Sequence, residues 1–362
     1  MKKPVRILLI AAFVLLIALA EPVWLAIGGQ DANTENRTLE ALPTLSAETW
    51  TTFAEDFTAW FNSHLPFRSA LVRLHTFINY QLGSSDNEDV ILGREDWLFY
   101  NSAADGDPMA NYRGEGLLTD DQLRQIADNM TALRDDLAAR GAAFVIVIAP
   151  NKSRVYSEYL PDSYGDPAEM YVARQVTEYL AENTDLTVLW LYDDLMAAKE
   201  TLGGRLLYHK ADTHWNMLGA YVGTARLLNT LGVDAAPAET LEIAETENTI
   251  CDLAGLLNLQ DIFMTQETDY TLPAVPTGSG TQDENEILRG GVGDDQRSVL
   301  FLKDSYGNMV FPYLCGRFAS VAAARWEVYE PAVVTDSRPD IVILECVERN
   351  IPRCLGSAYP VE

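Results

Sequence analysis

The chain has 362 residues, and its 48% hydrophobic and 22% charged residues are ordinary for a globular protein that can bury a large core. Its 26 basic residues against 53 acidic residues give a formal net charge of −27. This excess excludes nucleic acid as the default partner and argues against a peripheral grip on anionic lipid. The four cysteines form no CxxC pair and no zinc-ligand spacing, so we expect no structural zinc site.

The N-terminus begins with a short basic stretch and an apolar run. The apolar run covers residues 7–20, and Glu21 and Pro22 interrupt it. Cleavage near Ala20 would make this segment a signal peptide, whereas an uncleaved span of about 20 residues would be long enough to anchor in a bilayer. We therefore predict a signal anchor or signal peptide over residues 1–28. Both interpretations place the remainder outside the cytoplasm, because the basic flank stays inside.

The next part of the chain predicts helices and a hairpin. Residues 29–45 are polar and indicate a linker. Aromatic and aliphatic residues then recur at helical spacing through 46–80, with one break that separates two amphipathic helices. Segment 90–100 is typical of a hairpin, and segment 119–140 of a helix that stops at Gly141.

Buried strands alternate with helices from residue 143 onward. We expect strands at 143–149, 187–192, 299–302 and 341–345, and helices at 167–182, 193–202, 214–231 and 306–315. Residues 233–297 are rich in Glu, Thr, Asp and Gly and predict an inserted irregular region. The alternation predicts an α/β fold with a mainly parallel sheet covered on both faces. The chain has no Gly-rich phosphate loop, so we predict no nucleotide cofactor.

Three residues suggest acyl-transfer chemistry. Asp212 and His214 are two positions apart, so in an extended segment their side chains point to the same side. Ser305 comes just past the predicted strand 299–302, at the end of the strand where function collects in α/β sheets. A serine with a histidine base and an orienting aspartate is the set that acyl transfer requires. Ser305 and Asp212 could instead serve only as helix caps.

A metal site is the alternative chemistry for the same loop. His209, Asp212 and His214 lie within six residues and could supply ligands, with a further histidine ligand from His64 or His75. The three are not at helical spacing, and the two loop histidines differ in strand parity. We therefore predict no metal.

The motifs resemble a known family. The string at 212–216, Asp-Thr-His-Trp-Asn, and the string at 303–308, Lys-Asp-Ser-Tyr-Gly-Asn, resemble SGNH-hydrolase-like alginate O-acetyltransferase-type proteins, in particular their DHHW branch. Thr213 stands where the name of that branch has its first histidine. Further matches occur in a consistent order at 35–37, 93–100, 149–152 and 345–350.

The resemblance implies a fold, an activity and partners. It implies a three-layer SGNH-hydrolase-like sandwich over residues 46–362, with an N-terminal helical segment and the insertion at about 233–297. It implies an extracytoplasmic O-acetyltransferase or esterase that acts on a cell-surface or exported polysaccharide, supplied with acetyl groups by a membrane-bound O-acyltransferase. It also favours the anchor over the cleaved signal peptide. A non-catalytic carbohydrate-binding or assembly protein with the same fold is the alternative.

Further site residues follow from the turn and from the resemblance. The turn at Ser305 opens a helix, so the backbone N–H groups of Ser305 and Gly307 are the natural oxyanion hole. SGNH enzymes add an asparagine, and Asn151 could take that role. The predicted substrate-binding residues are Arg325, which resembles a ligand-binding arginine of the family, Trp215, Tyr306 and Lys152. Trp215 could instead serve packing, and Lys152 a structural ion pair.

Overall fold

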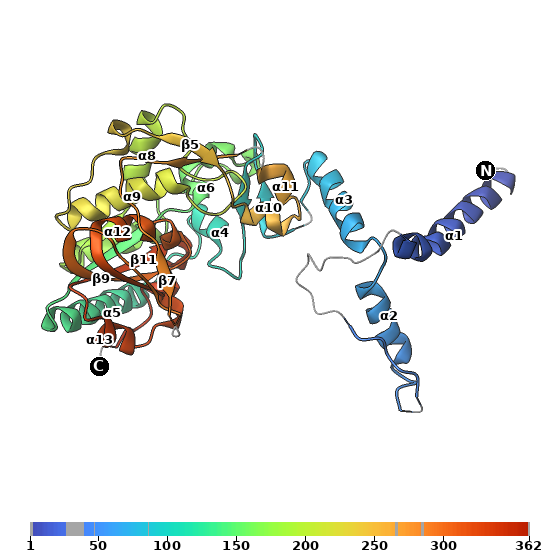
Figure 1. Ribbon diagram of the computed structural model, residues 1–362, viewed down its shortest axis with the longest axis horizontal. Coiled ribbons are helices and arrows are strands. Elements are labelled where there is room, and N and C mark those ends of the chain that lie inside the picture. The colour runs from blue at the N-terminus through green and yellow to red at the C-terminus, as the bar shows by residue number, and fades with distance from the viewer. Residues whose placement is uncertain are drawn as a thin grey trace. The chain divides into compact units, whose positions relative to one another are not determined.

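The computed structural model describes residues 3–26, 40–46, 48–85, 87–264, 267–283 and 286–360. The chain forms two compact units, residues 1–86 with 257–259 and residues 87–256 with 260–362. The helices of the first unit are α1 (Lys3–Ala26), α2 (Phe53–Ser63) and α3 (Arg68–Gln81) (Figure 1). The last two are the amphipathic helices that the sequence predicts.

The N-terminal segment is helical over its described residues. Within the described part of the chain, no helix combines the length and apolar character that crossing a membrane requires. In the N-terminal segment, the uninterrupted apolar run covers residues 7–20, because Arg6 precedes it and Glu21 follows it. The predicted linker lies outside the described residues up to position 39, and residues 40–46 form neither helix nor strand.

The second unit holds the sheet. Its strands are β1 (Val90–Leu92), β2 (Leu98–Tyr100), β3 (Ala143–Ala149), β4 (Val188–Trp190), β5 (Ala244–Glu247), β6 (Thr268–Thr271), β7 (Gly280–Gln282), β8 (Leu288–Gly290), β9 (Asp295–Lys303), β10 (Phe318–Arg325) and β11 (Ile341–Val347). Its α-helices are α4 (Pro108–Tyr112), α5 (Asp120–Ala139), α6 (Lys152–Val155), α7 (Val172–Asn183), α8 (Tyr192–Thr201), α9 (Met217–Thr230), α10 (Asp252–Leu256), α11 (Gln260–Phe263), α12 (Phe311–Arg317), α13 (Ala332–Ser337) and α14 (Ile351–Cys354).

The central sheet has seven strands in the order β4-β3-β11-β9-β10-β8-β7. The first five are parallel to their neighbours, and β8 and β7 add an antiparallel edge. The predicted mainly parallel α/β sheet is confirmed. The insertion is less irregular than we expected, because it supplies this edge and the separate β5–β6 ribbon.

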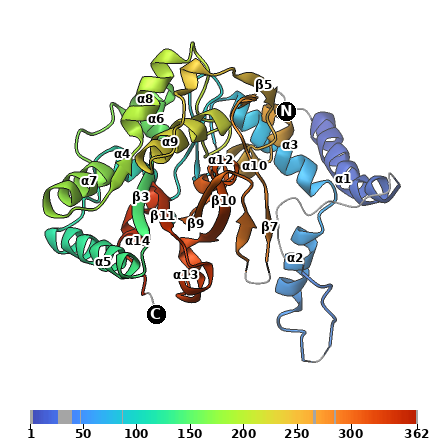
Figure 2. The same cartoon turned by 60° about the vertical axis from the view of Figure 1, so that its left-hand side comes forward.

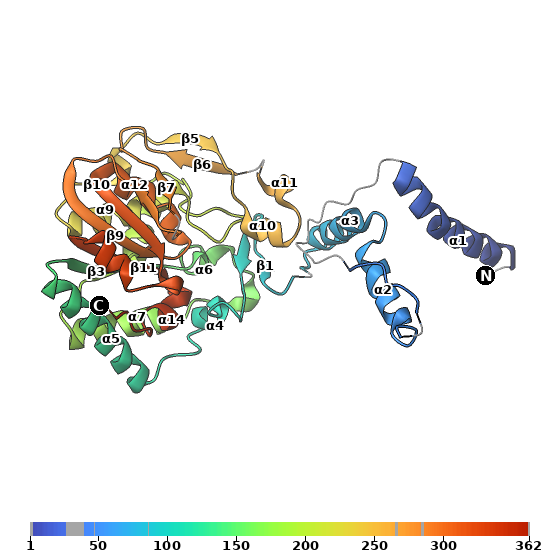
Figure 3. The same ribbon diagram turned by 60° about the horizontal axis from the view of Figure 1, so that its bottom comes forward.

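The two faces of the sheet bury separate cores. Along β9, Val299 and Phe301 pack into one core, whereas Leu300 and Leu302 pack into the other. Helices α8, α9 and α12 cover the first face, and α5 and α7 cover the second (Figures 2 and 3). Because both faces are covered, the inner strands are continuous apolar runs. Their carboxyl ends carry the site.

Candidate active site

The structure brings Asp212, His214 and Ser305 together in one hydrogen-bonded chain. Nδ1 of His214 lies 2.7 Å from Oδ1 of Asp212, and Nε2 lies 2.8 Å from Oγ of Ser305. The histidine and the aspartate come from the loop before α9, and the serine follows the carboxyl end of β9. The predicted convergence of the three side chains is confirmed.

Asp212 is held so that it stays ionised and fixes the imidazole. Its Oδ1 also accepts the backbone N–H of His214 at 2.9 Å, and its Oδ2 accepts the backbone N–H of Asp252 at 2.6 Å. Burial alone would raise the pKa of Asp212, but the hydrogen bond and charge of His214 outweigh burial and hold that pKa below its usual range. An ionised Asp212 accepts the Nδ1 proton, which leaves Nε2 free to accept the proton of Ser305.

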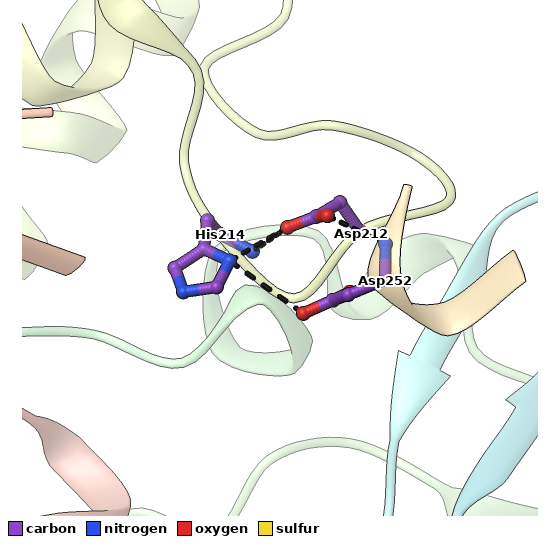
Figure 4. A group of neighbouring side chains, drawn as sticks. All are labelled: Asp212, His214 and Asp252. Carbon is purple, nitrogen blue, oxygen red and sulfur yellow. Dashed lines mark hydrogen bonds and ion pairs between the residues drawn. The ribbon is translucent and has the colours of Figure 1, made fainter. Parts of the chain in front are cut away.

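A second carboxylate, Asp252, faces the same ring nitrogen. Figure 4 shows Asp212 and Asp252 both directed at Nδ1 of His214, and the Asp252 carboxylate lies 3.6 Å away. Asp252 accepts the backbone N–H and the hydroxyl of Thr213 at 2.7 and 2.5 Å. Burial and the neighbouring Asp212 carboxylate raise the pKa of Asp252. Sequence reasoning missed this residue, because it lies 40 positions away from Asp212 in the insertion.

These residues suit a proton-transfer chain better than a cation site. Donor atoms of Asp212, His214 and Asp252 lie within 4.8 Å of one another. Both oxygens of Asp212 already accept N–H groups, and a cation at Nδ1 would displace the proton that Asp212 holds there. His209 does not join them. Its ring is buried, with its nitrogens 3.6 Å from Glu267 and 3.8 Å from Asp269.

The other two histidines considered as metal ligands belong to the first unit. His64 follows α2, and its Nδ1 lies 3.0 Å from the carbonyl of Trp60. His75 lies within α3. Within the loop, the ring of His209 lies near Glu267 and Asp269 and does not join Asp212 and His214, as the metal-site hypothesis assumed it would.

Lys152 fixes the loop that carries Asp212 and His214. Its side chain is buried, and Nζ donates to the carbonyls of His209, Lys210 and Asp212 at 3.0, 2.8 and 2.5 Å. The ammonium also lies 5.7 and 5.4 Å from the ring centroids of Trp97 and Phe99. Lys152 is thus enclosed by protein, which does not support the prediction that it binds substrate. Three carbonyls on one ammonium fix the backbone that carries Asp212 and His214.

Replacing this lysine should loosen the loop. We expect Lys152→Met to slow acylation of Ser305 about 100-fold, because it leaves three buried carbonyls without their donor and misplaces the base. The rate of labelling by a serine-directed reagent measures the effect. Lys199→Met is the matched control, since Lys199 donates to Val155 and Glu158 and not to the loop. Equal losses in both variants would contradict the expectation.

The same contact predicts an alkaline limb in the pH profile. Burial lowers the pKa of Lys152 to about 8, against the pull of Glu267, Asp212 and Asp252. As pH rises above 8 the ammonium is lost, so acylation should slow. The free energy of unfolding should instead rise through the titration of Lys152. Between pH 8 and the ordinary pKa of 10.5, the unfolded chain binds more protons than the folded chain. Lys152→Met should lack this alkaline limb.

The turn that carries Ser305 is tied to the end of β11. Asp304 accepts the backbone N–H groups of Tyr306 and Val347 at 2.9 and 2.8 Å. Glu345, buried in β11, accepts the backbone N–H of Asp304 at 3.2 Å. Burial and the nearby Asp304 carboxylate raise the pKa of Glu345 well above its ordinary value.

The two predicted backbone oxyanion donors keep their candidacy. In the described part of the chain, no intramolecular hydrogen bond takes up the N–H of Ser305 or of Gly307, so both stay candidate donors.

Asn151 lies away from the nucleophile. It is buried, its Oδ1 accepts from Arg349 at 3.3 Å, and its backbone N–H donates to Glu348 at 3.0 Å. It lines a separate small cavity together with Lys152 and Arg349 and not the cavity of Ser305. The structure therefore does not support Asn151 as an oxyanion donor.

Two predicted substrate-binding aromatics are also structural. Trp215 is fully buried, and its Nε1–H donates to the carbonyl of Tyr306 at 3.0 Å. Tyr306 is buried too, and its hydroxyl donates to the carbonyl of Thr213 at 2.5 Å. Both rings pack under the catalytic loop and do not line the cavity at Ser305. They stabilise the site without reaching a substrate.

Ser305 borders a cavity of about 570 Å³. Asn308 and Met309 border it beside Ser305 and His214. Asn308 is exposed, and its Oδ1 accepts from Nζ of Lys303 at 2.5 Å. The remaining lining residues are Asp212, Thr249, Ile250, Cys251, Asp252, Gly255, Gln260 and Met264. Arg325 does not line this cavity and borders a neighbouring one.

An α/β sheet with a hydrogen-bonded serine, histidine and aspartate at its carboxyl edge is typical of serine-hydrolase-like proteins, and comparison with known families identifies the class as SGNH-hydrolase-like. The family described as "SGNH hydrolase-like domain, acetyltransferase AlgX" matches residues 90–307, more than half of the chain. The chain belongs to this family, as its motifs predict.

Relatives and solved structures support the assignment. A probable alginate O-acetylase AlgJ of Pseudomonas fluorescens is 27% identical over 73% of this chain and 63% of its own length, so the chain spans less than two thirds of that relative. The fold matches a DHHW family protein of Eubacterium siraeum, at 16% identity and TM-score 0.52, over 74% of this chain and 97% of that one. It also matches Bacillus cereus PatB1 carrying a sulfonyl adduct, at 16% identity and TM-score 0.52, over 75% of this chain and 100% of that one.

Proposed function

We propose that this chain is an extracytoplasmic O-acetyltransferase that modifies a polysaccharide through an acetyl-enzyme on Ser305. The observation that carries the proposal is the hydrogen-bonded chain from Asp212 through His214 to Ser305, with distances of 2.7 and 2.8 Å. Membership of the AlgX family and the similarity to proteins named as probable alginate O-acetylases support an acetyl group as the group transferred and a polysaccharide as its acceptor.

In the first half-reaction Ser305 becomes acetylated. Nε2 of His214 takes the hydroxyl proton as Oγ attacks the carbonyl carbon of the acetyl donor. Asp212 accepts the Nδ1–H and stabilises the imidazolium that forms. The tetrahedral intermediate collapses, the bond to the donor's leaving group breaks, and His214 gives that group the proton.

In the second half-reaction the acetyl group leaves the enzyme. A sugar hydroxyl enters the cavity, and Nε2 of His214 takes its proton as the oxygen attacks the acetyl carbon. Ser305 leaves with the proton returned by the imidazolium, and an acetylated sugar results. Water in place of the sugar gives hydrolysis, so an esterase reaction uses the same groups.

The developing oxyanion needs donors beside Ser305. The backbone N–H groups of Ser305 and Gly307 are two of them. The side-chain amide of Asn308 is a third that we propose, because its Oδ1 is turned to Lys303 and its NH₂ group is then left for the cavity. Asn308 ends the motif string at 303–308, but only the turn after β9 brings its side chain to the border of the cavity.

The role of Asn308 gives a prediction. We expect Asn308→Asp to slow acylation about 100-fold, because it keeps an acceptor for Lys303 but removes the amide donor and adds a charge that repels an oxyanion. Rapid-mixing assays with a small activated acetyl ester measure this rate. Thr249→Ala, which changes another side chain that borders the cavity, serves as the control and should leave the rate within a few-fold. A wild-type rate in Asn308→Asp would remove this residue from the oxyanion hole.

The proposal as a whole is tested by trapping the intermediate. The purified chain is mixed with a small activated acetyl ester, and peptide mass spectrometry looks for acetyl on Ser305. Adding an acceptor oligosaccharide should speed the decay of the acetyl-enzyme and yield acetylated sugar. If the chain neither forms the intermediate nor turns over acetyl esters, the carbohydrate-binding interpretation is the better one.

Partners and location follow from the same reaction. We propose that a membrane-bound O-acyltransferase supplies the acetyl group outside the cytoplasm, where no cytoplasmic acetyl donor is at hand. The basic start and the apolar run 7–20 support export. A reporter fused after Glu362 should be active only outside the cytoplasm, and a cytoplasmic reporter signal would contradict export.

A further inference from the structure

A second cavity lies beside the site of Ser305. Its volume is about 630 Å³, close to the catalytic cavity in size, and Asn308 borders both. Lys303 and Arg325 contribute its basic groups, from the carboxyl ends of β9 and β10. Val328 and Tyr329 give it an apolar wall. Cavities of this size, with one apolar wall and several polar groups, are typical of small-molecule or sugar-unit sites.

The two basic groups of this cavity are already engaged. The Arg325 guanidinium pairs with both carboxylate oxygens of Glu327, at 3.2 and 2.6 Å. Nζ of Lys303 donates to Asn308 at 2.5 Å and lies 3.4 Å from the carbonyl of Asp304, and burial lowers the pKa of this lysine. An incoming carboxylate would have to displace these partners before it could use either cation.

Carboxylates outnumber cations around both cavities. Glu286, Glu330 and Asp336 line the second cavity, and within the described residues their side chains take part in no ion pair or hydrogen bond. Asp212 and Asp252 line the catalytic cavity, which has no lysine or arginine among its lining residues. The whole chain carries 26 basic and 53 acidic residues, and 26 − 53 gives the formal charge of −27. Local and overall charges thus repel an acidic sugar.

We propose that this second cavity binds the sugar units next to the acetylated hydroxyl, and that it accepts neutral or amino sugars and rejects uronic acids. The inference rests on the proposed function, because only that function makes one sugar hydroxyl the acetylated one. The binding preference itself can be measured without catalysis. The wall formed by Val328 and Tyr329 suits the C–H face of a sugar ring. The carboxylates of Glu286, Glu330 and Asp336 suit hydroxyl and ammonium donors.

Binding to the catalytically inert full chain tests the preference. Calorimetry of Ser305→Ala with three hexamers of matched length, namely N-acetylglucosamine, glucosamine and galacturonate, separates neutral, cationic and anionic ligands. We expect the neutral and cationic hexamers to bind at least about tenfold more tightly than the galacturonate hexamer at low salt. Added salt should weaken the binding of the cationic hexamer and reduce the difference in affinity between the cationic and the anionic hexamer.

A charge reversal locates the preference in this cavity. Asp336→Lys should raise the affinity for the galacturonate hexamer. Glu182→Lys makes the same change of charge on α7, which packs beside β4 at the opposite edge of the sheet, and it should not raise that affinity. Equal or tighter galacturonate binding by the parent chain, equal responses of the two variants, or no binding of any hexamer would each overturn the inference. The acetyl-enzyme assay on wild type is independent of these outcomes. Selective binding without an acetyl-enzyme would contradict the proposed function and leave the binding preference standing.

Discussion

Ser305→Ala should abolish covalent labelling by a serine-directed reagent and all turnover of a small acetyl ester, and His214→Ala should slow labelling about 1000-fold or more. A serine hydroxyl is a poor nucleophile until a base removes its proton, and Nε2 of His214 lies 2.8 Å from Oγ. Because the serine and the histidine act together, removal of either one loses nearly all of the rate acceleration that the pair provides. Intact-mass spectrometry gives the labelling rate, and circular dichroism checks that both variants fold.

Controls separate this result from other chemistry and from misfolding. Ser298→Ala is the matched serine control, because Ser298 sits on the same strand and binds Asp340 and Arg338, far along β9 from the nucleophile. It should label at the wild-type rate. A chelator should leave the wild-type rate unchanged. Full activity in Ser305→Ala together with loss on chelation would favour a metal-dependent hydrolase.

The inner strands were predictable because their burial is simple. In β3, β9 and β11 both faces are covered, so each strand is a short apolar run that stands out from its polar flanks. Strand β10 was not predicted, since Phe318–Arg325 contains four alanines, which favour strands weakly. The short β7 and β8 are polar, and only their pairing at the sheet edge makes them strands.

The convergence of Asp212, His214 and Ser305 could be predicted from the sequence, but the groups around them could not. Asp212, His214 and Ser305 are reactive residue types in suggestive positions, so chemistry alone connects them. The direction of a backbone N–H depends on the acceptor that the fold supplies, and the N–H of Tyr306 is directed to Asp304 for this reason. Lys152 is polar in sequence yet fully enclosed, because three carbonyls of one loop surround its ammonium. Such contacts arise only when distant segments meet.

Asp212→Asn should reduce acylation of Ser305 about 10⁴-fold, whereas Asp252→Asn should reduce it less than about tenfold. Both carboxylates face Nδ1 of His214, but Asp212 is at 2.7 Å and Asp252 at 3.6 Å. An amide at position 212 can donate to Nδ1 and so leave the proton on Nε2, where the base must be free. The Asp252 carboxylate accepts from Thr213, and an asparagine oxygen can still accept there. Labelling rates of the two variants across pH measure the difference. Equal losses would mean that the two carboxylates share the orienting role, and a larger loss in Asp252→Asn would transfer it to Asp252.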